Sequence, residues 1–449
     1  AFQFNGDFGS FQLDTNIANP DSTSFTNLLP GIYMVSEIVP SNWTLSDIQC
    51  SAGDGTIITL GGEGGFDPGD QGVTIDLADG DSVVCTFIND ADGSISVTKA
   101  TEPAGSPQSF DFSGDITATL TDGQTSTAVL VPPGNYSVTE AAIAGWDITG
   151  IACSDDDSTG AGDTASFVVA PGEVVNCIFT NTQRGTITLV KELPNDNGGD
   201  AVETDFTAFI DGTTVPWGVA QEYVPGNYTA SETTLTGYEP SGWFTDCAAD
   251  GSVTLGPGEN LTCTITNDDI APTLTLVKTV VNDNGGLLEQ SDFPSFVNGT
   301  PQAWDVATEV QANTLLTASE TPQTGYAPSA WGGDCASDGT ITLLPGDVKT
   351  CTITNDDVAP LLTLIKDPTN DDFGTALPDD FLPTVGGVVV VSGQSNPYEA
   401  NLPYAIDETL LPGYSFVSIT GDVKCPAVLG DPVTLAPGDD ITCTITNDD

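Results

Sequence analysis

The sequence predicts an all-β chain, built as a tandem array of β-sandwich repeats, and three observations lead to this prediction. The 449 residues include 49 Gly and 30 Pro, which disfavours long helices. Apolar residues alternate with polar ones in short runs such as Thr186–Lys191 and Cys263–Asn267, and turn dipeptides such as Pro225-Gly226 separate the runs. The third observation is that the same short blocks recur along the chain at a nearly constant spacing.

The recurring blocks define the period of the array. A segment Cys-x-[Phe/Ile]-x-Asn begins at five places, in each case five residues after a Gly: Cys85, Cys177, Cys263, Cys351 and Cys443. A second block has an aromatic residue six positions after a Glu, at Glu37/Trp43, Glu140/Trp146, Glu232/Tyr238, Glu320/Tyr326 and Glu408/Tyr414. A third block is an alternating strand that ends in Lys, at Lys99, Lys191, Lys278 and Lys366.

This period predicts five domains of about 90 residues each. We call them repeat 1 (residues 1–92, without its first strand), repeat 2 (93–183), repeat 3 (184–270), repeat 4 (271–358) and repeat 5 (359–449). The linkers between them are only a few residues long and some contain Pro, for example Asp269–Pro272. Short linkers of this kind favour a stiff, elongated rod over a flexible chain.

Composition excludes several functions. Seven Lys and Arg against 64 Asp and Glu leave a net charge of −57, which excludes a nucleic-acid partner. The absence of His excludes Ser-His-Asp and Cys-His catalysis and any zinc site that needs imidazole, so we expect no enzyme acting on other molecules. A hydrophobic content of 39% predicts buried cores, but no apolar run is long enough for membrane insertion.

The cysteines follow the same period, with two in every repeat. An even number per repeat, without metal-type spacing, predicts disulfides and therefore an extracellular or cell-surface location; free buried thiols are the alternative. The natural pairs are Cys50–Cys85, Cys153–Cys177, Cys247–Cys263, Cys335–Cys351 and Cys425–Cys443.

Strand parity places unusual polar residues in the core. Residues i and i+2 of a strand share a face, so Lys191 lies in phase with Leu189, Glu232 with Ala230 and Asn267 with Ile265. Burying an ammonium and a carboxylate is costly unless they are paired, yet four of the chain's six Lys occupy this position. Attack of a desolvated Lys amine on the Asn amide would expel ammonia and leave a neutral crosslink. In the alternative, the Lys ends its strand in solvent and the Asn caps a turn.

These residues resemble the prealbumin-like (transthyretin-like, Cna-B/SpaA-type) repeat domains of bacterial surface adhesins and pilins, which are Ig-like β-sandwiches. The match rests on first-strand Lys191, the box from Glu232 to Tyr238 and last-strand Asn267. In that family Lys, Glu and Asn form a self-catalysed intramolecular isopeptide bond. The resemblance implies the triads Lys99/Glu140/Asn181, Lys191/Glu232/Asn267, Lys278/Glu320/Asn355 and Lys366/Glu408/Asn447. The paired Cys depart from the simplest family pattern, and no Leu-Pro-x-Thr-Gly sorting signal is present.

Repeat 1 departs from the pattern because it keeps Glu37 and Asn89 but has no Lys. The Phe that follows the Lys in the other repeats corresponds to Phe2 or Phe4, so we expect that the chain begins one strand late. At the other end, a further Lys-bearing strand is expected after Asn447. An open sandwich edge has to be filled by another strand. We therefore expect either a window from a longer repeat array or copies of the chain joined head to tail.

Three loops rich in oxygen ligands are candidates for calcium, around Asp196, Asp283 and Asp371. They lack the ligand spacing and the terminal bidentate Glu of an EF-hand, so we interpret them as ordinary turns and expect no cofactor, with calcium as the alternative. The sequence as a whole predicts the structural subunit or shaft of an extracellular filament, pilus or adhesin stalk. The alternatives are an adhesin module that binds a host protein or glycan, and an acidic, calcium-dependent matrix protein.

Overall fold

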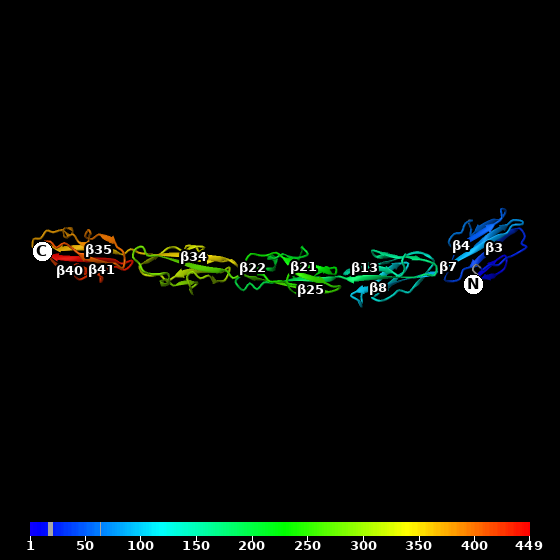
Figure 1. The fold of residues 1–449 in the computed structure, drawn as a ribbon, viewed down its shortest axis with the longest axis horizontal. Coiled ribbons are helices and arrows are strands. Elements are labelled where there is room, and N and C mark those ends of the chain that lie inside the picture. The colour runs from blue at the N-terminus through cyan, green and yellow to red at the C-terminus, as the bar shows by residue number, and fades with distance from the viewer. Residues whose placement is uncertain (17–20, 63) are drawn as a thin grey trace. The chain divides into compact units, whose positions relative to one another are not determined.

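The computed structural model describes residues 1–16, 21–62 and 64–449, and its regular elements are almost all β-strands (Figure 1). The exceptions are three single 3-10 turns: η1 (Glu203–Asp205), η2 (Gln290–Asp292) and η3 (Pro378–Phe381). The all-β prediction is therefore confirmed. Among the described residues, no helix has the length and apolar character needed to span a bilayer.

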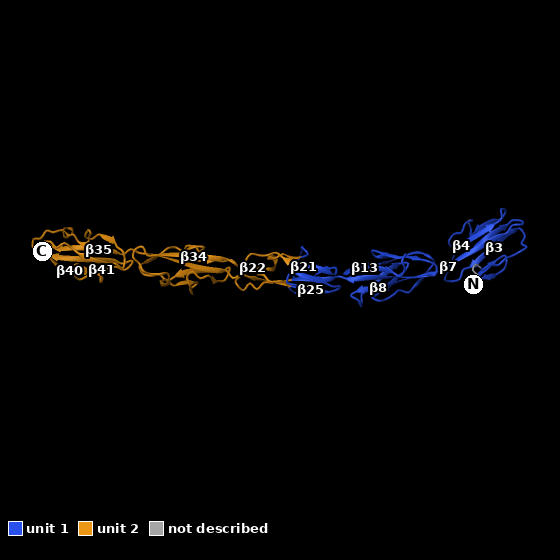
Figure 2. Ribbon diagram, in the orientation of Figure 1, with its two compact units in different colours: residues 1–189, 210–230, 244–263 blue, residues 190–209, 231–243, 264–449 orange. Residues whose placement is uncertain are grey.

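The described residues form two compact units (Figure 2). Unit 1 contains residues 1–189, 210–230 and 244–263, and unit 2 contains residues 190–209, 231–243 and 264–449. Repeats 1 and 2 thus lie in unit 1 and repeats 4 and 5 in unit 2, whereas the division passes through repeat 3.

Repeat 2 shows the sandwich most fully. One sheet has the order β10 (Ala118–Leu120), β9 (Phe110–Gly114), β12 (Gly134–Glu140), β15 (Thr164–Val169) and β14 (Thr159–Ala161). The other has the order β11 (Val129–Val131), β8 (Gly93–Glu102), β16 (Val174–Gln183) and β13 (Trp146–Cys153). Alternate residues of both sheets, such as Val97, Phe112 and Phe179, share one core cluster. First strand β8 pairs parallel to last strand β16, and this neighbour relation carries the candidate site.

Repeats 4 and 5 in unit 2 have the same order of strands. In repeat 4 the first sheet has the order β29 (Thr308–Glu309), β26 (Thr273–Val281), β34 (Val348–Asp357) and β31 (Tyr326–Pro328), and β32 (Gly332–Gly333) also pairs with β34. The second sheet has the order β28 (Thr300–Gln302), β27 (Ser295–Val297), β30 (Leu315–Glu320) and β33 (Thr340–Thr342). In repeat 5 they are β38 (Ser395–Pro397), β35 (Leu361–Thr369), β42 (Asp440–Asp448), β40 (Ser415–Gly421), and β37 (Val388–Val389), β36 (Thr384–Val385), β39 (Pro403–Asp407), β41 (Pro432–Thr434). First and last strands are again parallel neighbours.

Repeat 3 repeats this arrangement. Its sheets are β20 (Gln221–Tyr223), β17 (Gly185–Glu192), β25 (Asn260–Asp269), β22 (Tyr238–Pro240), with β23 (Phe244–Thr245) on β25, and β19 (Thr213–Val215), β18 (Ala208–Ile210), β21 (Gly226–Glu232), β24 (Ser252–Leu255). The tandem array of β-sandwiches predicted from the sequence is therefore present.

Repeat 1 has one complete and one incomplete sheet. The complete sheet has the order β2 (Phe11–Leu13), β1 (Phe2–Gly6), β3 (Gly31–Ile38), β6 (Gly72–Leu77), β5 (Ile57–Leu60). The second sheet has only β4 (Trp43–Ala52) and β7 (Val83–Ala91) among the described residues. Strand β7 corresponds to β16, because Cys85 on β7 stands opposite Cys50 as Cys177 on β16 stands opposite Cys153. The edge of β7 that would receive a parallel first strand has no partner in the described part of the chain.

Candidate functional sites: buried Lys-Glu-Asn triads

In repeats 2, 4 and 5 the parallel pairing of first and last strands brings the Lys and Asn of the triad onto one face of a sheet. In repeat 4, Lys278 on β26 stands opposite Ile353 on β34, and Asn355 lies two positions further along β34. Since side chains alternate along a strand, Lys278, Ile353 and Asn355 all point to the core. The same offset occurs in repeats 2 and 5, where Lys99 stands opposite Phe179 and Lys366 opposite Ile445.

The Glu of each triad comes from the opposing sheet. Glu140 ends β12, Glu232 ends β21 and Glu320 ends β30, whereas Glu408 directly follows β39. Each carboxylate thus reaches across the sandwich to the Lys. Bringing the three residues together needs both sheets, so no single strand contains the whole site.

The Lys and Asn of each triad are buried, and the side chain of the Glu is exposed by at most 6%. The Lys residues are exposed by 0%, 6%, 7% and 2% in repeats 2 to 5, and the Asn residues by 2%, 1%, 1% and 0%. Strand parity predicts this inward direction. An ammonium and a carboxylate at such depth each carry a desolvation cost of several kcal/mol, so these positions are costly for stability in the absence of a chemical role.

The Lys and Glu are in direct contact in repeats 3 to 5. Lys191 Nζ lies 2.5 Å from Glu232 Oε2, and Lys278 Nζ makes an equally direct ion pair with Glu320. In repeat 5, Lys366 Nζ and Glu408 Oε2 form an ion pair at 2.9 Å. Burial lowers the pKa of each of these three Lys, and the adjacent carboxylate opposes that shift.

Repeat 2 holds the same groups in a slightly different arrangement. Lys99 Nζ lies 3.6 Å from Glu140 Oε2 and donates hydrogen bonds to the carbonyls of Ala100 and Phe179. Glu140 in turn accepts a short hydrogen bond from Asn181 Nδ2. Burial lowers the pKa of Lys99 and raises the pKa of Glu140, so desolvation favours the neutral form of both groups.

In repeats 2 and 5 the same carboxylate also positions the Asn amide, whereas Asn355 Nδ2 in repeat 4 is buried without a hydrogen-bond partner. Asn447 Nδ2 donates to Glu408 Oε1 at 2.5 Å, as Asn181 does to Glu140. The Oδ1 atoms of Asn181, Asn267, Asn355 and Asn447 are buried without a hydrogen-bond partner. A buried carbonyl oxygen without a donor is costly for folding, and a proton on the nearby carboxyl would satisfy it.

A phenylalanine ring lies against each buried ammonium, a role that the sequence analysis did not assign. Nζ lies 4.4, 3.9, 4.4 and 4.2 Å from the ring centroids in repeats 2 to 5, and the rings belong to Phe110, Phe206, Phe293 and Phe381. The ring face attracts the cation and excludes water from it. The signal was in the sequence, because this Phe follows the Lys by 15 residues in repeats 3 to 5.

Repeat 1 contains two members of a triad. Asn89 Nδ2 donates a hydrogen bond of 2.8 Å to Glu37 Oε1, and Glu37 is 2% exposed. Burial raises the pKa of Glu37, and the hydrogen bond from Asn89 acts in the opposite direction. The pair lies inside the sandwich next to the open edge of β7, where the first-strand Lys of the other repeats would be.

Five disulfides join the Cys pairs predicted from the sequence. Cys50–Cys85 and Cys153–Cys177 connect directly opposite residues of neighbouring strands. In repeats 3 to 5 the first Cys, for example Cys335, lies in a loop. The second Cys always precedes the triad Asn by four residues on the last strand, so disulfide and triad secure the same strand.

Acidic clusters form at the three loops considered for calcium. Asp196 lies with Asp268 and Asp269, and the same grouping occurs at Asp283, Asp356, Asp357 and at Asp371, Asp448, Asp449, with ligand atoms within 4.8 Å of one another. The Asp269 carboxylate already accepts backbone N–H groups of Asn197 and Gly199, as turn chemistry requires. The interpretation of these loops as ordinary turns, with calcium as the alternative, stays a prediction.

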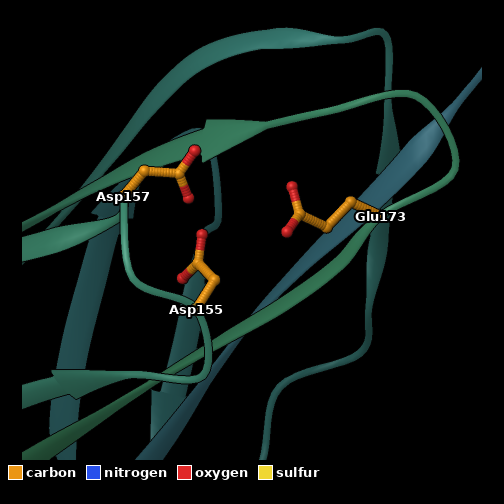
Figure 3. Close-up of side chains that lie close together, drawn as sticks. All are labelled: Asp155, Asp157 and Glu173. Carbon is orange, nitrogen blue, oxygen red and sulfur yellow. The ribbon is translucent and has the colours of Figure 1, made fainter.

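A further acidic group lies in repeat 2, where Asp155, Asp157 and Glu173 turn their carboxylates toward one another (Figure 3). A hydrogen bond shared with Asp155 raises the pKa of Asp157. Glu173 accepts the backbone N–H of Ala170, and Asp155 accepts the hydroxyl of Ser158. These contacts are those of a carboxylate-stabilised turn.

Comparison with known families agrees with the fold. Two sequence models of the prealbumin-like fold domain match the chain, one at residues 1–91 and 95–183 and the other at residues 182–265, 269–353 and 356–445. The chain belongs to the prealbumin-like fold domain family. A search of curated proteins found no match.

Solved structures similar to this prealbumin-like chain are distant. The Bacillus anthracis TIE protein shares 15% identity, with 90% of this chain and 76% of that one covered and a TM-score of 0.37. The pilus adhesin SpaC from Lactobacillus rhamnosus GG shares 12% identity, with 73% and 57% covered and a TM-score of 0.25. Two B repeat units of the Staphylococcus aureus collagen-binding protein share 13%, with 80% and 99% covered and a TM-score of 0.16.

Proposed function

We propose that this chain is a structural segment of an extracellular filament, pilus or adhesin stalk, in which Lys–Asn isopeptide bonds close repeats 2 to 5. The observation that supports this proposal most strongly is the fourfold recurrence of a buried Lys beside a Glu from the opposing sheet and an Asn on the neighbouring strand. Five disulfides fit an oxidising, extracellular location, and membership of the prealbumin-like family fits a repeat protein with a structural role.

The chemistry of the bond follows from the groups in contact. The Glu accepts a proton from the Lys ammonium, and the neutral amine attacks Cγ of the Asn side chain. The protonated carboxyl donates to Oδ1 as the tetrahedral intermediate forms, and a proton then passes to Nδ2. The Nζ–Cγ bond forms, the Cγ–Nδ2 bond breaks and ammonia leaves. The product is a neutral amide, which removes the buried ammonium, and the reaction needs no cofactor.

Replacing the Glu of one triad by Ala tests the role of that carboxylate in forming the isopeptide bond. Lys278, Glu320 and Asn355 of repeat 4 suit this test because Glu309 on β29 of the same repeat is an exposed carboxylate and gives a matched control. We expect that Glu320→Ala leaves Lys278 and Asn355 unlinked in peptide maps, whereas Glu309→Ala keeps the crosslink. A crosslink that persists in Glu320→Ala contradicts the assigned role of the carboxylate.

For repeat 1 we propose that a Lys-bearing strand from another repeat completes the open edge of β7. Three features support this: β7 has no parallel neighbour among the described residues, Glu37 and Asn89 form the pair that positions an amide in repeats 2 and 5, and repeat 1 has no Lys. The added strand gains main-chain hydrogen bonds, as β8 does on β16. Copies of the chain joined head to tail, or a longer array of the same repeats, supply such a strand.

A peptide with the sequence of β17, Gly185–Glu192, tests strand completion in the full chain. We expect this peptide to bind repeat 1 and to form a covalent adduct at Asn89 with loss of ammonia. The same peptide with Arg in place of Lys should bind without forming the adduct, and Glu37→Ala should abolish the adduct but not the binding. Failure of both peptides to bind contradicts strand completion while leaving the crosslinks of repeats 2 to 5 untouched.

A further inference from the structure

The Asn-Asp-Asn-Gly-Gly loops of unit 2 are held in shape by one aspartate each. In repeat 4, Asp357 accepts backbone hydrogen bonds from Asn284 and Gly286 of the loop. Tyr326 fixes the start of the loop by donating its hydroxyl to Asn282. Repeat 3 has the same contacts around Asp269, and repeat 5 has them around Asp449.

The carbonyl groups of two of these loops accept hydrogen bonds from the next repeat. Ala312 of repeat 4 donates its backbone N–H to the carbonyl of Asn197 in repeat 3 at 2.8 Å, and Asn313 Nδ2 donates to the carbonyl of Gly198 at 2.9 Å. Repeat 5 contacts repeat 4 in the same way. Ala400 N donates to Asn284 O at 2.7 Å and Asn401 Nδ2 to Gly285 O at 2.8 Å.

This contact requires the first of the two glycines in each loop. A Cβ atom on Gly198 would lie 2.6 Å from the carbonyl oxygen of Ala312, and one on Gly285 would lie 2.5 Å from that of Ala400. Both atoms belong to backbone, which cannot rotate away. Ala312 and Ala400 are each only 1% exposed, so the next repeat fits closely over the loop.

The sequence pairs loop and turn from one repeat to the next. Ala followed by Asn stands eight residues before the triad Glu in repeats 4 and 5, which are the repeats that follow an Asn-Asp-Asn-Gly-Gly loop. Repeat 3 has Val224-Pro225 at that position, and repeat 2 before it has no such loop. The loop and the Ala-Asn turn therefore occur together across a junction, although they belong to different repeats.

Repeat 5 carries a different residue at the contact point. Its loop keeps the hydrogen bonds to Asp449, but Phe373 occupies the position of Gly198 and Gly285. Phe373 has a left-handed backbone with φ of 73° and is fully exposed, at 101%. At the two glycines, even a Cβ atom has no room beneath a docked Ala-Asn turn.

We infer that this loop is a docking element that selects which repeat can pack on it. Gly at its fourth position leaves room for an Ala-Asn turn of the next repeat, whereas Phe373 at that position sterically excludes such a turn. The contact of repeats 3 with 4 and 4 with 5 is then specific and rigid. The inference is independent of isopeptide chemistry, because no triad residue takes part in the contact.

Amide hydrogen exchange in the full chain tests the inference at the Ala400 N–H. Gly285→Ala should accelerate exchange there by on the order of tenfold or more, since the hydrogen bond to Asn284 is displaced. Gly299→Ala is the matched control, because Gly299 has a similar left-handed φ of 78° but nothing within 4 Å of an added Cβ. Gly285→Phe, which copies repeat 5, should act at least as strongly as Gly285→Ala.

A second variant keeps the backbone free of strain. Asn401→Gly removes the side-chain hydrogen bond to Gly285 at a left-handed position that Gly adopts readily, and it should also accelerate exchange at Ala400. Unchanged exchange at Ala400 in Gly285→Ala overturns the inference. So does an equal acceleration in Gly299→Ala, because the effect would then reflect general loss of stability.

Discussion

Asn89 and Glu37 in repeat 1 form the amide–carboxylate hydrogen bond that Asn447 and Glu408 form in repeat 5. In repeat 5, Lys366 completes the group, whereas repeat 1 has no Lys. Repeat 1 therefore keeps the hydrogen-bonded Asn and Glu without a Lys of its own beside them. The effect of burying the carboxylate on stability can therefore be measured in repeat 1, where no Lys of the same repeat can form a crosslink.

The pH dependence of repeat 1 should reveal the buried carboxyl. Burial raises the pKa of Glu37 above its ordinary 4.5, so the folded state binds the proton more tightly than the unfolded state. The stabilisation from this group is full below the unfolded pKa and is lost as pH rises through the folded pKa. Glu37→Gln should make repeat 1 more stable at neutral pH and flatten that slope, as measured by amide exchange of β7 between pH 4 and 8. Asp76→Asn, an exposed position on β6, is the control, and an identical slope in Glu37→Gln would refute the prediction.

Loss of the crosslink in repeat 4 should also weaken that repeat. In the chain-entropy model a crosslink that closes a loop as long as the one from Lys278 to Asn355 contributes about 4 kcal/mol. Glu320→Ala should therefore lower the unfolding temperature of repeat 4 in calorimetry of the full chain, while the transitions of the other repeats stay in place. A melting profile identical to that of Glu309→Ala would argue against a covalent bond there.

The disulfide of repeat 4 closes a shorter loop. Cys335 and Cys351 are 16 residues apart, so their removal should cost about 3 kcal/mol in the same model. The double change Cys335→Ala and Cys351→Ala should raise the amide exchange of β34 without affecting crosslinking of Asn355. Loss of the isopeptide bond in this variant would show that the disulfide is needed to assemble the triad.

Calcium should have little effect on thermal unfolding. Asp269, Asp357 and Asp449 already accept backbone N–H groups of their loops, so turn chemistry accounts for their positions. Unfolding temperatures in calcium and in chelator should agree. A clear rise in calcium that disappears in Asp283→Asn would instead establish the calcium-dependent alternative.

Much of the site could be predicted because strand parity is a local property. The period of two places Lys191, Glu232 and Asn267 on inward faces, and the repeated Cys spacing is enough to pair the disulfides. The parallel register of Lys278 against Ile353 could not be obtained this way, since it depends on how two distant strands meet. The role of Phe293 over the ammonium and the seating of Ala400 on Gly285 are likewise contacts between distant segments.

The repeated loops illustrate the same limit. The sequence of Asn282–Gly286 is equally consistent with a calcium loop and with a turn, because both use side-chain oxygens and glycine. Only the fold brings Asp357 beneath the loop and Ala400 above it. The requirement for Gly285 thus depends on the next repeat, which no pattern inside the loop can reveal.

The intact mass of the reduced, unfolded chain tests whether repeats 2 to 5 contain the proposed isopeptide bonds. Each isopeptide bond expels one ammonia molecule, so we expect a mass lower than that of the sequence by four ammonia molecules. We also expect crosslinked peptides that join Lys99 to Asn181, Lys191 to Asn267, Lys278 to Asn355 and Lys366 to Asn447. A mass equal to that of the unmodified sequence, with free Lys and Asn in those peptides, would contradict it.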